Sequence, residues 1–591
     1  MEHKFDPILV EVVKHELAAI TEEMAIAVSK TARSAMVKIG DFAATICDGQ
    51  GRLIGPGYAA PFQLATFIEV MSHVLKKWGG TCKPGDVIVV NDPYAGMGHM
   101  PDVAIIAPAF WRGQLVAFNL AYSHHTDTGG RFAGGFSSQC TETFEEGVRL
   151  PVVKLYSEGE RNDALLETIL ANVRTPEEWV GDVEAKVAGC WRGEQEIRAL
   201  LDKYGRETFT SCCDYLIDYA ERETRTAIRS MPDGQYVRED IFEDDGFGSA
   251  GVVFKLKVAL QVAGDTLTAD FTGTDPQAKG AINLPFSMTK AMVYGALKVI
   301  VSSDVPLNVG FVRPIQVIAS LGSLLNPRFP AAVGGRAPLA FRVCDMVFRA
   351  LAEVLPEEVP VPGEGGDVLH FTGQAADGRY FAAMDGFFGG WGGRPAKDGI
   401  DGVTPMTFGS YGTTPAELLE REYPLVVDGF GYVPDSGGAG KHRGSLSVYR
   451  QWRFLQPGKI MVRTNRLTRV SDGLAGGQPG ALSQNILNPG TENVELPRQT
   501  HMHLEVKPGD RIFHAISGSG GHGDPWEREP EKVLADVKDE KVTIAGAREQ
   551  YGVVIDPQSL SVNWEKTVKL RQGRQQPERL LNRNAKHSYT L

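Results

Sequence analysis

The residues best suited to chemistry lie between positions 91 and 130, where imidazole and carboxylate side chains gather. The segment NDPYAGMGHMPD holds His99 and Asp102 in His-x-x-Asp spacing, and AYSHHTDTGG holds His124, His125 and Asp127. Together these groups suit a borderline divalent ion such as zinc, manganese or iron(II). A single His-x-x-Asp pair is weak evidence, but five such side chains within 29 residues predict a metal site. The alternative is that they are turn and helix-cap residues with one or two core histidines.

Two β-like runs would have to deliver these side chains to one point. The runs VIVVND (87–92) and FNLAYSHH (118–125) each end in a polar loop. We expect them to be adjacent strands that end at one edge of a sheet, so that ligands from distant positions meet there. Asp41, at the end of the first predicted helix, is a candidate fourth ligand or a general base.

The remaining pattern predicts a mixed α/β chain of the α+β class. Apolar residues at three- and four-residue steps predict a helix over 7–39, with Asp6 as N-cap, Pro7 at the first helical position and Gly40 at the end. Further helices are expected at 61–78, within 160–230, at 285–303 and at 337–355, and alternating strands at 235–275. A Gly-rich region with short strands (360–525) precedes two short helices and a loose basic end.

These elements suggest four segments that are interwoven rather than separate. We expect a metal-site α/β domain at 1–230, an antiparallel β-rich segment with a helix at 231–330, a Gly-rich mixed domain with mixed sheets at 331–530 and a charged helical tail at 531–591.

Composition excludes several classes of protein. The 591 residues carry 61 Lys and Arg against 73 Asp and Glu, for a net charge of −12. Without a basic block the chain is not expected to bind duplex DNA. Seven cysteines without a CxxC pair argue against a disulfide scaffold or a cysteine zinc module. No signal-like start and no run of about 18 apolar residues occur, so we expect a cytoplasmic protein without a membrane span.

Two glycine motifs resemble nucleotide sites without satisfying their requirements. Gly518, Gly520 and Gly523 fit GxGxxG, but Pro525 follows where a dinucleotide site needs a helix to begin. The run GGAGKHRGS has His442 where a phosphate loop needs Ser or Thr. The chain therefore has no recognisable ATP site.

Eight ordered blocks resemble the hydantoinase B/oxoprolinase family over most of the chain. The blocks are NDPYAGMGHMPD (91–102), SHHTDTGG (123–130), TETFEEGVRLPVVKL (141–155), DFTGTDPQAKGAIN (270–283), GGWGGRPAKDG (389–399), EREYPLVV (420–427), PDSGGAGKHRG (434–444) and SGSGGHGDPWERE (517–529). This family includes subunits of ATP-dependent hydantoinases, the C-terminal half of 5-oxoprolinase and metal subunits of acetone and acetophenone carboxylases.

The resemblance implies a role for several residues of this chain. His99, Asp102 and His124 match the family's metal ligands, and Asp41 matches the Asp of its DF motif. Asp41, His125 and Asp127 are catalytic candidates, because Asp41 or His125 could orient water or carry protons. Glu142 is a substrate-binding candidate, and Lys154 falls in the same motif without an assigned role.

The resemblance also implies a partner that supplies the missing ATP site. Family subunits work with a hyuA-type ATP-binding subunit, which binds ATP-Mg and phosphorylates a carbonyl oxygen of the substrate; we expect an A2B2 or larger hetero-oligomer. In the amidohydrolases, water activated by the divalent ion then opens the ring. In the carboxylases, a phosphoenol meets CO2 derived from bicarbonate.

Departures from the family pattern concern the expected pocket. SAMVKIGDFAA (34–44) and FQLATF (62–67) place apolar residues where many relatives have charged or polar ones. The apolar positions are Met36, Val37, Ile39, Phe62 and Phe67. If Met36, Phe62 and Phe67 bind substrate, the substrate is less polar than hydantoin or 5-oxoproline, such as caprolactam or an aryl ketone. Alternatively, these residues belong to the core.

Three functions are compatible with these features. The first is the metal subunit of an ATP-dependent amidohydrolase that opens a lactam or related cyclic amide. The second is a subunit of a ketone carboxylase of the acetone or acetophenone type, which would use bicarbonate. The third is a scaffold that only shapes the partner's site, in which case replacing His99 or Asp102 would leave activity intact.

Overall fold

The computed structural model describes residues 7–574, except positions 56, 59, 60, 250, 303, 376, 377, 407 and 410. The chain divides into two compact units and passes between them more than once. The first unit comprises Met1–Ala350, His370–Met384 and Thr407–Tyr411, and the second comprises Leu351–Leu369, Asp385–Met406 and Gly412–Leu591. Helices combine with mixed and antiparallel sheets, which confirms the predicted α+β class.

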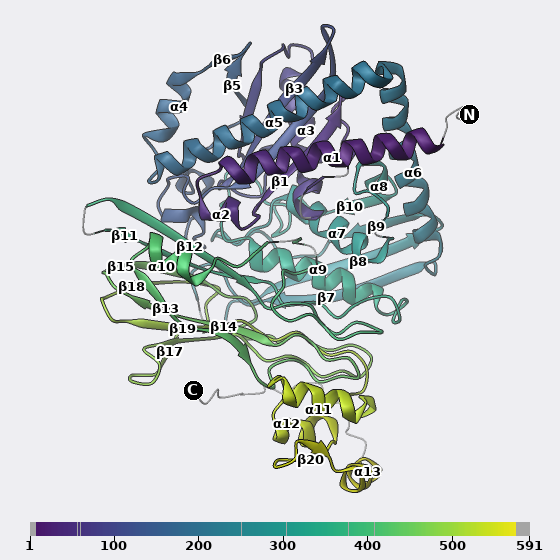
Figure 1. Ribbon diagram of the computed structural model, residues 1–591, viewed down its shortest axis with the longest axis vertical. Helices are drawn as coiled ribbons and strands as arrows, with labels where there is room; N and C mark the ends of the chain where they lie inside the picture. The colour runs from purple at the N-terminus through teal and green to yellow at the C-terminus, as the bar shows by residue number, and fades with distance from the viewer. Residues whose placement is uncertain are drawn as a thin grey trace. The chain divides into compact units, whose positions relative to one another are not determined.

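The first unit is built on a six-stranded antiparallel sheet with the order β1-β4-β3-β2-β5-β6 (Figure 1). Its strands are β1 (Phe42–Asp48), β2 (Val87–Val90), β3 (Asp102–Trp111), β4 (Gln114–His124), β5 (Val153–Ser157) and β6 (Glu160–Arg161). The expectation that 87–92 and 118–125 form adjacent strands is wrong, because β3 forms a hairpin with β4 and lies between β2 and β4. β2 and β4 still run in the same direction and end at the same edge of the sheet.

Long helices cover one face of this sheet. They are α1 (Pro7–Thr31), α5 (Pro176–Tyr204) and α6 (Arg206–Arg229), and the short α4 (Asp163–Leu170) comes directly before α5. α1 lies alongside α5, and α5 packs on β3 and β4 (Figure 1). Leu17 and Met24 of α1 share one apolar core with Val183 and Ile197 of α5. The covered sheet is therefore a rigid support for loops at its edge.

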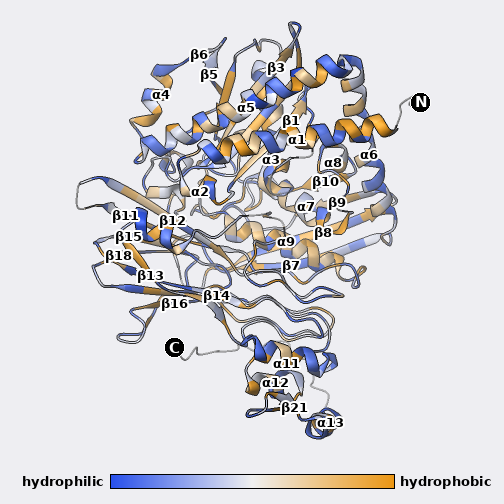
Figure 2. Ribbon diagram, in the orientation of Figure 1, coloured by the Kyte–Doolittle hydropathy of each residue, from blue (hydrophilic) through white to orange (hydrophobic). Residues whose placement is uncertain are grey.

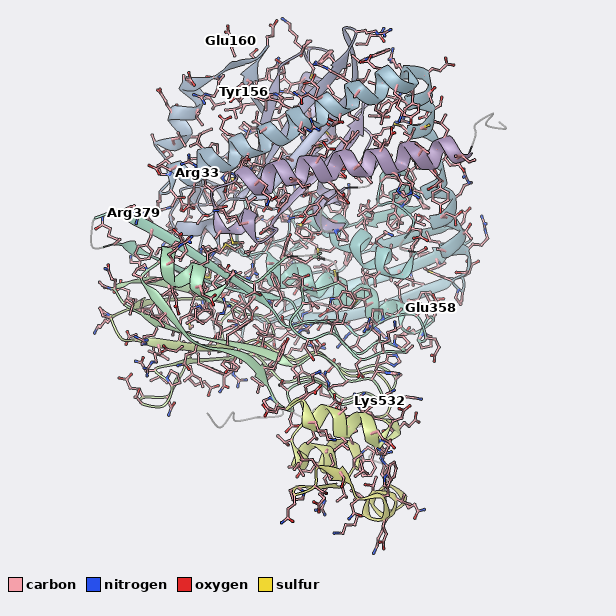
Figure 3. The ribbon with its side chains drawn as sticks, viewed as in Figure 1. Arg33, Tyr156, Glu160, Glu358, Arg379 and Lys532 are labelled. Atoms are coloured by element: carbon pink, nitrogen blue, oxygen red, sulfur yellow. The ribbon has the colours of Figure 1, made fainter. Side chains whose placement is uncertain are left out.

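The predicted helix over 7–39 is interrupted near its end. α1 stops at Thr31, and a short α2 (Ala35–Lys38) follows with Ser34 as its N-cap. The backbone N–H groups of Arg33 (Figure 3) and Ser34 donate to the Asp182 carboxylate of α5, at 2.8 and 3.0 Å. These long-range hydrogen bonds fix the break between α1 and α2. The spacing of nearby residues does not predict it. Gly40, with φ +103°, ends the segment as expected, whereas Asp6 lies outside the described residues.

The rest of the first unit adds helices and a second sheet. The elements are α3 (Pro61–Trp78), α7 (Phe286–Ile300), α8 (Val309–Val312), α9 (Ala337–Leu351), β7 (Gly234–Phe242), β8 (Phe254–Ala263), β9 (Thr266–Asp270), β10 (Ile315–Ile318), η1 (Pro93–Ala95), η2 (Ala133–Gly135) and η3 (Thr143–Glu145). The sheet has the order β10-β9-β8-β7, and α3 packs on α7. The helix predicted at 61–78 is confirmed at both ends.

The second unit contains most of the short strands. The elements are β11 (Gly366–Gln374), β12 (Tyr380–Phe388), α10 (Ala416–Glu422), β13 (Leu425–Val433), β14 (Ser447–Phe454), β15 (Gly458–Arg463), β16 (Gln484–Leu487), β17 (Val494–Glu495), β18 (His501–Val506), β19 (Arg511–Ala515), η4 (Pro525–Glu527), α11 (Pro530–Lys538), α12 (Ile544–Tyr551), β20 (Ile555–Asp556), β21 (Ser561–Val562) and α13 (Trp564–Gln572). The sheets run β12-β11-β15-β18, β13-β14-β19-β16-β17 and β20-β21. The segment His370–Met384, from the two strands β11 and β12, is counted with the first unit.

Glycines of the second unit allow three loops to pack closely. The first loop contains Gly438 and Gly444, the second contains Gly477 and Gln478, and the third contains Ser519 and Gly521. A Cβ atom on Gly444 would lie 2.0 Å from the Ser519 carbonyl oxygen, and one on Gly477 would lie 2.0 Å from that of Gly521. The backbone of Gly438 donates to Ser519 at 2.8 Å, and that of Gly521 donates to Gln478 at 2.9 Å. The GxGxxG sequence therefore lies against other backbone and is followed only by the three-residue η4, not by an α-helix, which fits the interpretation as a glycine turn.

The hydropathy of the residues differs from one helix to another. Figure 2 shows mixed polar and apolar residues along α5 and α6 and an apolar start to α1. None of the described helices is both long enough and apolar enough to cross a membrane. The two short helices predicted after position 526 are present as α11 and α12. A third helix, α13, is not predicted and includes the first four residues of the expected loose basic end, the rest of which lies largely outside the described residues.

Candidate metal centre

Three predicted ligands meet at the open end of the β3–β4 hairpin. Asp102 opens β3 directly opposite His124, the last residue of β4. His99 reaches the same point from the loop before β3, and its Nε2 atom lies 3.2 Å from Nε2 of His124. One ligand atom from each of the three buried residues lies within 4.8 Å of the others. Among the described residues this is the group of imidazole and carboxylate side chains that could hold a metal ion.

Asp102 is held as a carboxylate by its neighbours. Oδ2 lies 2.8 Å from Nδ1 of His99 and accepts from the Arg336 guanidinium at 2.9 Å, and Oδ1 accepts from the Tyr122 hydroxyl at 2.9 Å. Burial opposes ionisation, but the charges of His99 and Arg336 outweigh it and lower the pKa of Asp102 well below its usual value. Burial and Asp102 in turn raise the pKa of Tyr122, so its hydroxyl keeps its proton.

His124 is held in its neutral form, which is the form that binds metals. Burial and the neighbouring His99 lower its pKa well below the usual value. The ring stacks on Phe136 with 4.9 Å between centroids and 18° between planes. Nδ1 has no hydrogen-bond partner in the described part of the chain. The site is thus apolar on one side and provides nitrogen ligands on the other.

The spacing of the two imidazoles fits a shared divalent ion. The two ring nitrogens of His99 face different partners, Nδ1 lying 2.8 Å from Oδ2 of Asp102 and Nε2 lying 3.2 Å from Nε2 of His124. The Nε2 proton of His124 can fill the space between the two nitrogens, and a metal ion displaces such a proton. Two nitrogens each about 2.0–2.1 Å from a tetrahedral zinc ion lie about 3.3 Å apart. The observed 3.2 Å matches this value.

Comparison with protein families decides the relationship of the chain. Residues 6–525 match the family described as hydantoinase B/oxoprolinase. The chain belongs to this family. The hydantoinase B/oxoprolinase match includes all three residues of the cluster and the hairpin that carries two of them.

Relatives of this hydantoinase B/oxoprolinase chain agree over nearly its full length. A putative D-/L-hydantoinase subunit from Pseudomonas sp. (strain NS671) is 32% identical and is matched over 96% of this chain and 98% of its own. The crystal structure of the ATP-dependent caprolactamase from Pseudomonas jessenii superposes with a TM-score of 0.87 at 28% identity, covering 96% of this chain and 100% of that chain. A nucleotide-free acetone carboxylase shares the fold, with a TM-score of 0.83 at 18% identity over 96% and 82% of the two chains.

Asp41 lies beside the cluster in this family member. Its backbone carbonyl accepts from the His124 N–H at 3.2 Å, and its Oδ1 accepts from Nε2 of Gln63 at 3.2 Å. The same Gln63 nitrogen donates to the Tyr411 hydroxyl at 2.6 Å. The Asp41 carboxylate is not one of the three groups brought within 4.8 Å. Its part as a ligand or base stays a prediction.

His125 and Asp127 have other partners than the cluster. Nε2 of His125 lies 2.7 Å from the Lys186 ammonium, away from His124, because successive strand residues point to opposite faces. Asp127 accepts from Gly129, Gly134 and Arg174, including two bonds from Arg174 at 2.8 and 3.0 Å. These contacts give both residues structural partners, and their catalytic roles stay a prediction.

The predicted apolar positions are buried close to the site. Phe67 packs edge-on against Tyr122 at 6.3 Å between ring centroids, and Phe62 contacts Phe408 at 4.3 Å. Met36 is buried in α2, whereas Val37 belongs to the apolar core under the sheet. Val37 therefore belongs to the core. Phe67 contacts Tyr122, Phe62 precedes Gln63 in the chain, and the backbone carbonyl of Met36 accepts from the Asp41 N–H at 3.1 Å.

Glu142 is exposed at the start of η3, and the buried carboxyl of this motif is Glu146. Oε1 of Glu146 accepts from the backbone of Val333 at 2.8 Å and of Gly334 at 2.5 Å. Burial raises the pKa of Glu146 to about 7. Lys154 forms an ion pair with Asp86 at 2.7 Å and so supports β5.

Several residues of the site could not be found from local spacing. Arg336, His370, Tyr411 and Lys186 come from distant parts of the chain. His370 lies 5.0 Å from Phe136 between ring centroids and contributes to the low pKa of His124. Of these four residues, only Lys186 has a local signal in the sequence, because this charged residue occupies an apolar position of α5 between Val183 and Cys190.

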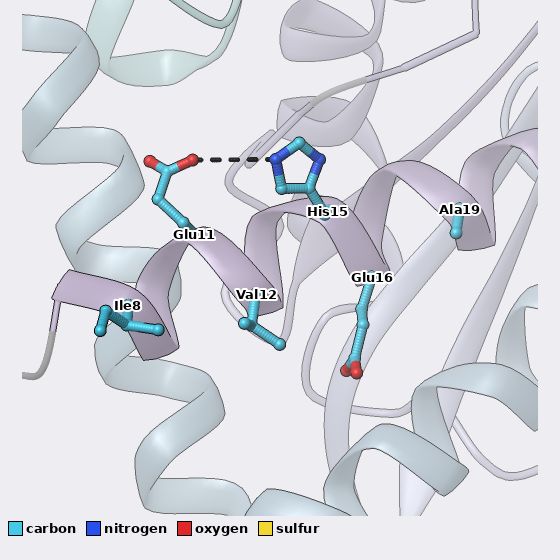
Figure 4. Close-up of a pocket in the computed structure, with 6 residues that line it drawn as sticks. All are labelled: Ile8, Glu11, Val12, His15, Glu16 and Ala19. Carbon is cyan, nitrogen blue, oxygen red and sulfur yellow. Dashed lines mark ion pairs between the residues drawn. The ribbon is translucent and has the colours of Figure 1, made fainter.

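A separate pocket lies on the outer face of α1. Ile8, Glu11, Val12, His15, Glu16 and Ala19 line it (Figure 4). His15 is paired with Glu11 at 4.0 Å. The pocket is open and offers one imidazole, so it does not compete with the buried cluster as a metal site.

Proposed function

We propose that this chain is the metal-containing subunit of an ATP-dependent hydrolase that opens a lactam or related cyclic amide. The buried group of His99, Asp102 and His124 carries the proposal, because it presents two imidazoles and a carboxylate at one point. Asp41 is the proposed fourth ligand. The names of the relatives, a hydantoinase subunit and an ATP-dependent caprolactamase, support the substrate class.

The chain's own residues prepare the ligands. Nδ1 of His99 lies 2.8 Å from Oδ2 of Asp102, and its Nε2 lies 3.2 Å from Nε2 of His124, so the ring stands between the other two proposed ligands. Arg336 and Tyr122 hold Asp102 in place, and Phe136 shields His124 from water. A bound divalent ion polarises a carbonyl and lowers the pKa of water, which supplies a nucleophile at neutral pH.

The substrate is activated elsewhere in this proposal. The sequence contains no recognisable phosphate loop, so a hyuA-type partner would bind ATP-Mg and phosphorylate the substrate carbonyl. An unstrained amide is a poor electrophile, and phosphorylation on oxygen makes its carbon reactive. The apolar Phe62 and Phe67 beside the site favour a plain lactam over a hydantoin, which needs more hydrogen-bond partners.

Metal analysis tests the centre first. Purified wild-type protein is expected to hold about one zinc, manganese or iron ion per chain, and His99→Ala and Asp102→Ala are expected to lose it. His15→Ala is the matched control, because the His15 side chain is 79% exposed on α1. Wild-type protein that neither contains nor takes up a divalent ion would refute the proposal.

Product analysis tests the reaction. The chain, co-purified with its ATP-binding partner, is supplied with ATP and a series of lactams, hydantoins and ketones. We expect an amino acid product from a lactam and no incorporation of labelled bicarbonate. A labelled keto acid would identify a carboxylase instead, and turnover by the His99→Ala complex would identify a scaffold.

A further inference from the structure

A buried lysine lies directly behind the metal centre. Lys186, in the middle of α5, has no exposed surface although it is a charged residue. Its ammonium donates to the Val103 carbonyl at 2.9 Å, to the Ser123 hydroxyl at 2.8 Å and to Nε2 of His125 at 2.7 Å. An ammonium has three N–H donors, so all of them are used.

These three acceptors share a position relative to the ligands. Val103 follows Asp102, and Ser123 and His125 stand on either side of His124. Val103 and Ser123 face each other across the β3–β4 ladder, one step from the pair of Asp102 and His124. Neighbouring residues of a strand point to opposite faces, so Lys186 holds the backbone on the side opposite the ligand side chains.

The cost of this arrangement argues for a specific purpose. In the described part of the chain no carboxylate lies within ion-pair distance of Lys186; Asp182 and Asp102 act on it only from further away, and its three hydrogen-bond acceptors are neutral groups. Burial of a charge with neutral partners is unfavourable relative to an apolar side chain of similar length. Cys190, one turn further along α5, packs on the same two strands without any charge. Packing alone therefore does not require a lysine here.

We propose that Lys186 is a positioning residue for the metal centre, which fixes the ends of β3 and β4 so that Asp102 and His124 keep the spacing of ligands. This inference rests on the proposed function, because it presumes a bound divalent ion. It assigns His125 a structural part as one of the three acceptors.

Metal affinity of matched variants tests the inference. Lys186→Met removes the three donors and keeps the length of the side chain, and Cys190→Ala is the control on the same helix face. Affinity for Zn²⁺ is measured by competition with a chelator, and geometry by the absorption spectrum of the Co²⁺-loaded protein. Metal-free stability is measured separately in urea with chelator present.

We expect Lys186→Met to weaken Zn²⁺ binding about 10- to 100-fold and to change the Co²⁺ spectrum. Cys190→Ala is expected to lose stability with less than about a threefold change in Zn²⁺ affinity. If Lys186→Met does not fold, Ser123→Ala removes one acceptor and is expected to weaken Zn²⁺ binding by a smaller factor. Wild-type affinity and spectrum in the folded Lys186→Met protein, or in Ser123→Ala where only that variant folds, would overturn the inference.

The outcomes separate the two proposals. Wild-type protein that binds no divalent ion defeats the proposed function and the role of Lys186 with it. Wild-type protein that binds Zn²⁺ while Lys186→Met binds it equally well defeats only the role of Lys186.

Discussion

The ion pair between Asp102 and Arg336 is a buried contact of opposite charges at the candidate centre. Both side chains are nearly fully buried and lie 2.9 Å apart. Removing one member of such a pair leaves an uncompensated charge and costs about 3–5 kcal/mol. The same carboxylate therefore serves folding and ligation, and the two effects can be separated by experiment.

We predict that Asp102→Ala loses both metal binding and about 3–5 kcal/mol of unfolding free energy. Asp102→Ala/Arg336→Met removes both charges and is expected to recover most of that stability without recovering the metal. Unfolding in urea with chelator present, together with metal analysis, measures the two quantities. A double variant as unstable as Asp102→Ala would contradict the assignment of the loss to the unpaired guanidinium.

Glu146 predicts a pH dependence of stability. Its pKa is raised to about 7 by burial, above its unfolded value near 4.5, so the folded state holds a proton that the unfolded state releases. Its contribution is complete below about pH 4.5 and is lost as the pH rises to 7, at about 1.4 kcal/mol per unit of pKa difference. Glu146→Gln keeps the acceptor for Val333 and Gly334 and is expected to flatten this slope. Unfolding curves from pH 5 to 8 that superpose for both proteins would rule this out.

Local spacing predicts only part of the site. His99, Asp102 and His124 are recognisable because the ends of two paired strands bring them together. Arg336 and Tyr411 are separated from them by hundreds of residues, and an isolated Arg or Tyr has no spacing to interpret. His125 is misleading for the opposite reason, since adjacency in the sequence of a strand places it on the other face.

At the scale of elements, three glycine loops hold the second unit together. The Gly444 α-carbon lies so close to the Ser519 carbonyl that a Cβ atom would be 2.0 Å from its oxygen. Gly386 in β12 is a matched contrast, because its nearest neighbour would be 3.9 Å away. The sequence predicts many turns from its glycine content, but close approach of distant loops leaves no such local signal.

We expect Gly444→Ala to cost more than about 2 kcal/mol of unfolding free energy or to prevent folding, because backbone atoms must move. Gly386→Ala is expected to be neutral or to stabilise by up to about 1 kcal/mol, since alanine loses less conformational entropy. Thermal unfolding of both variants measures the contrast. Equal stability of the two variants would show that the loops adapt to an added methyl group.

At the scale of the whole molecule, metal binding is expected to stabilise the first unit. A ligand at 100 times its Kd stabilises the folded state by about 2.7 kcal/mol, and the proposed ligands all belong to that unit. Calorimetry of chelated protein, before and after metal addition, should show a higher Tm in the wild type and in His15→Ala. Asp102→Asn should show no shift, and a shift of equal size there would place the ion elsewhere.

The chain's repeated passage between its two units has a consequence for inheritance. Tyr411, which accepts from Gln63, and His370, which lies against Phe136, are encoded within stretches that otherwise specify the second unit. Genetic recombination at position 350 would therefore combine the proposed metal ligands of one parent gene with the Tyr411 and His370 of another. Descendants of such an exchange would inherit an unmatched centre, so the two units are expected to pass between genomes together rather than as separate modules.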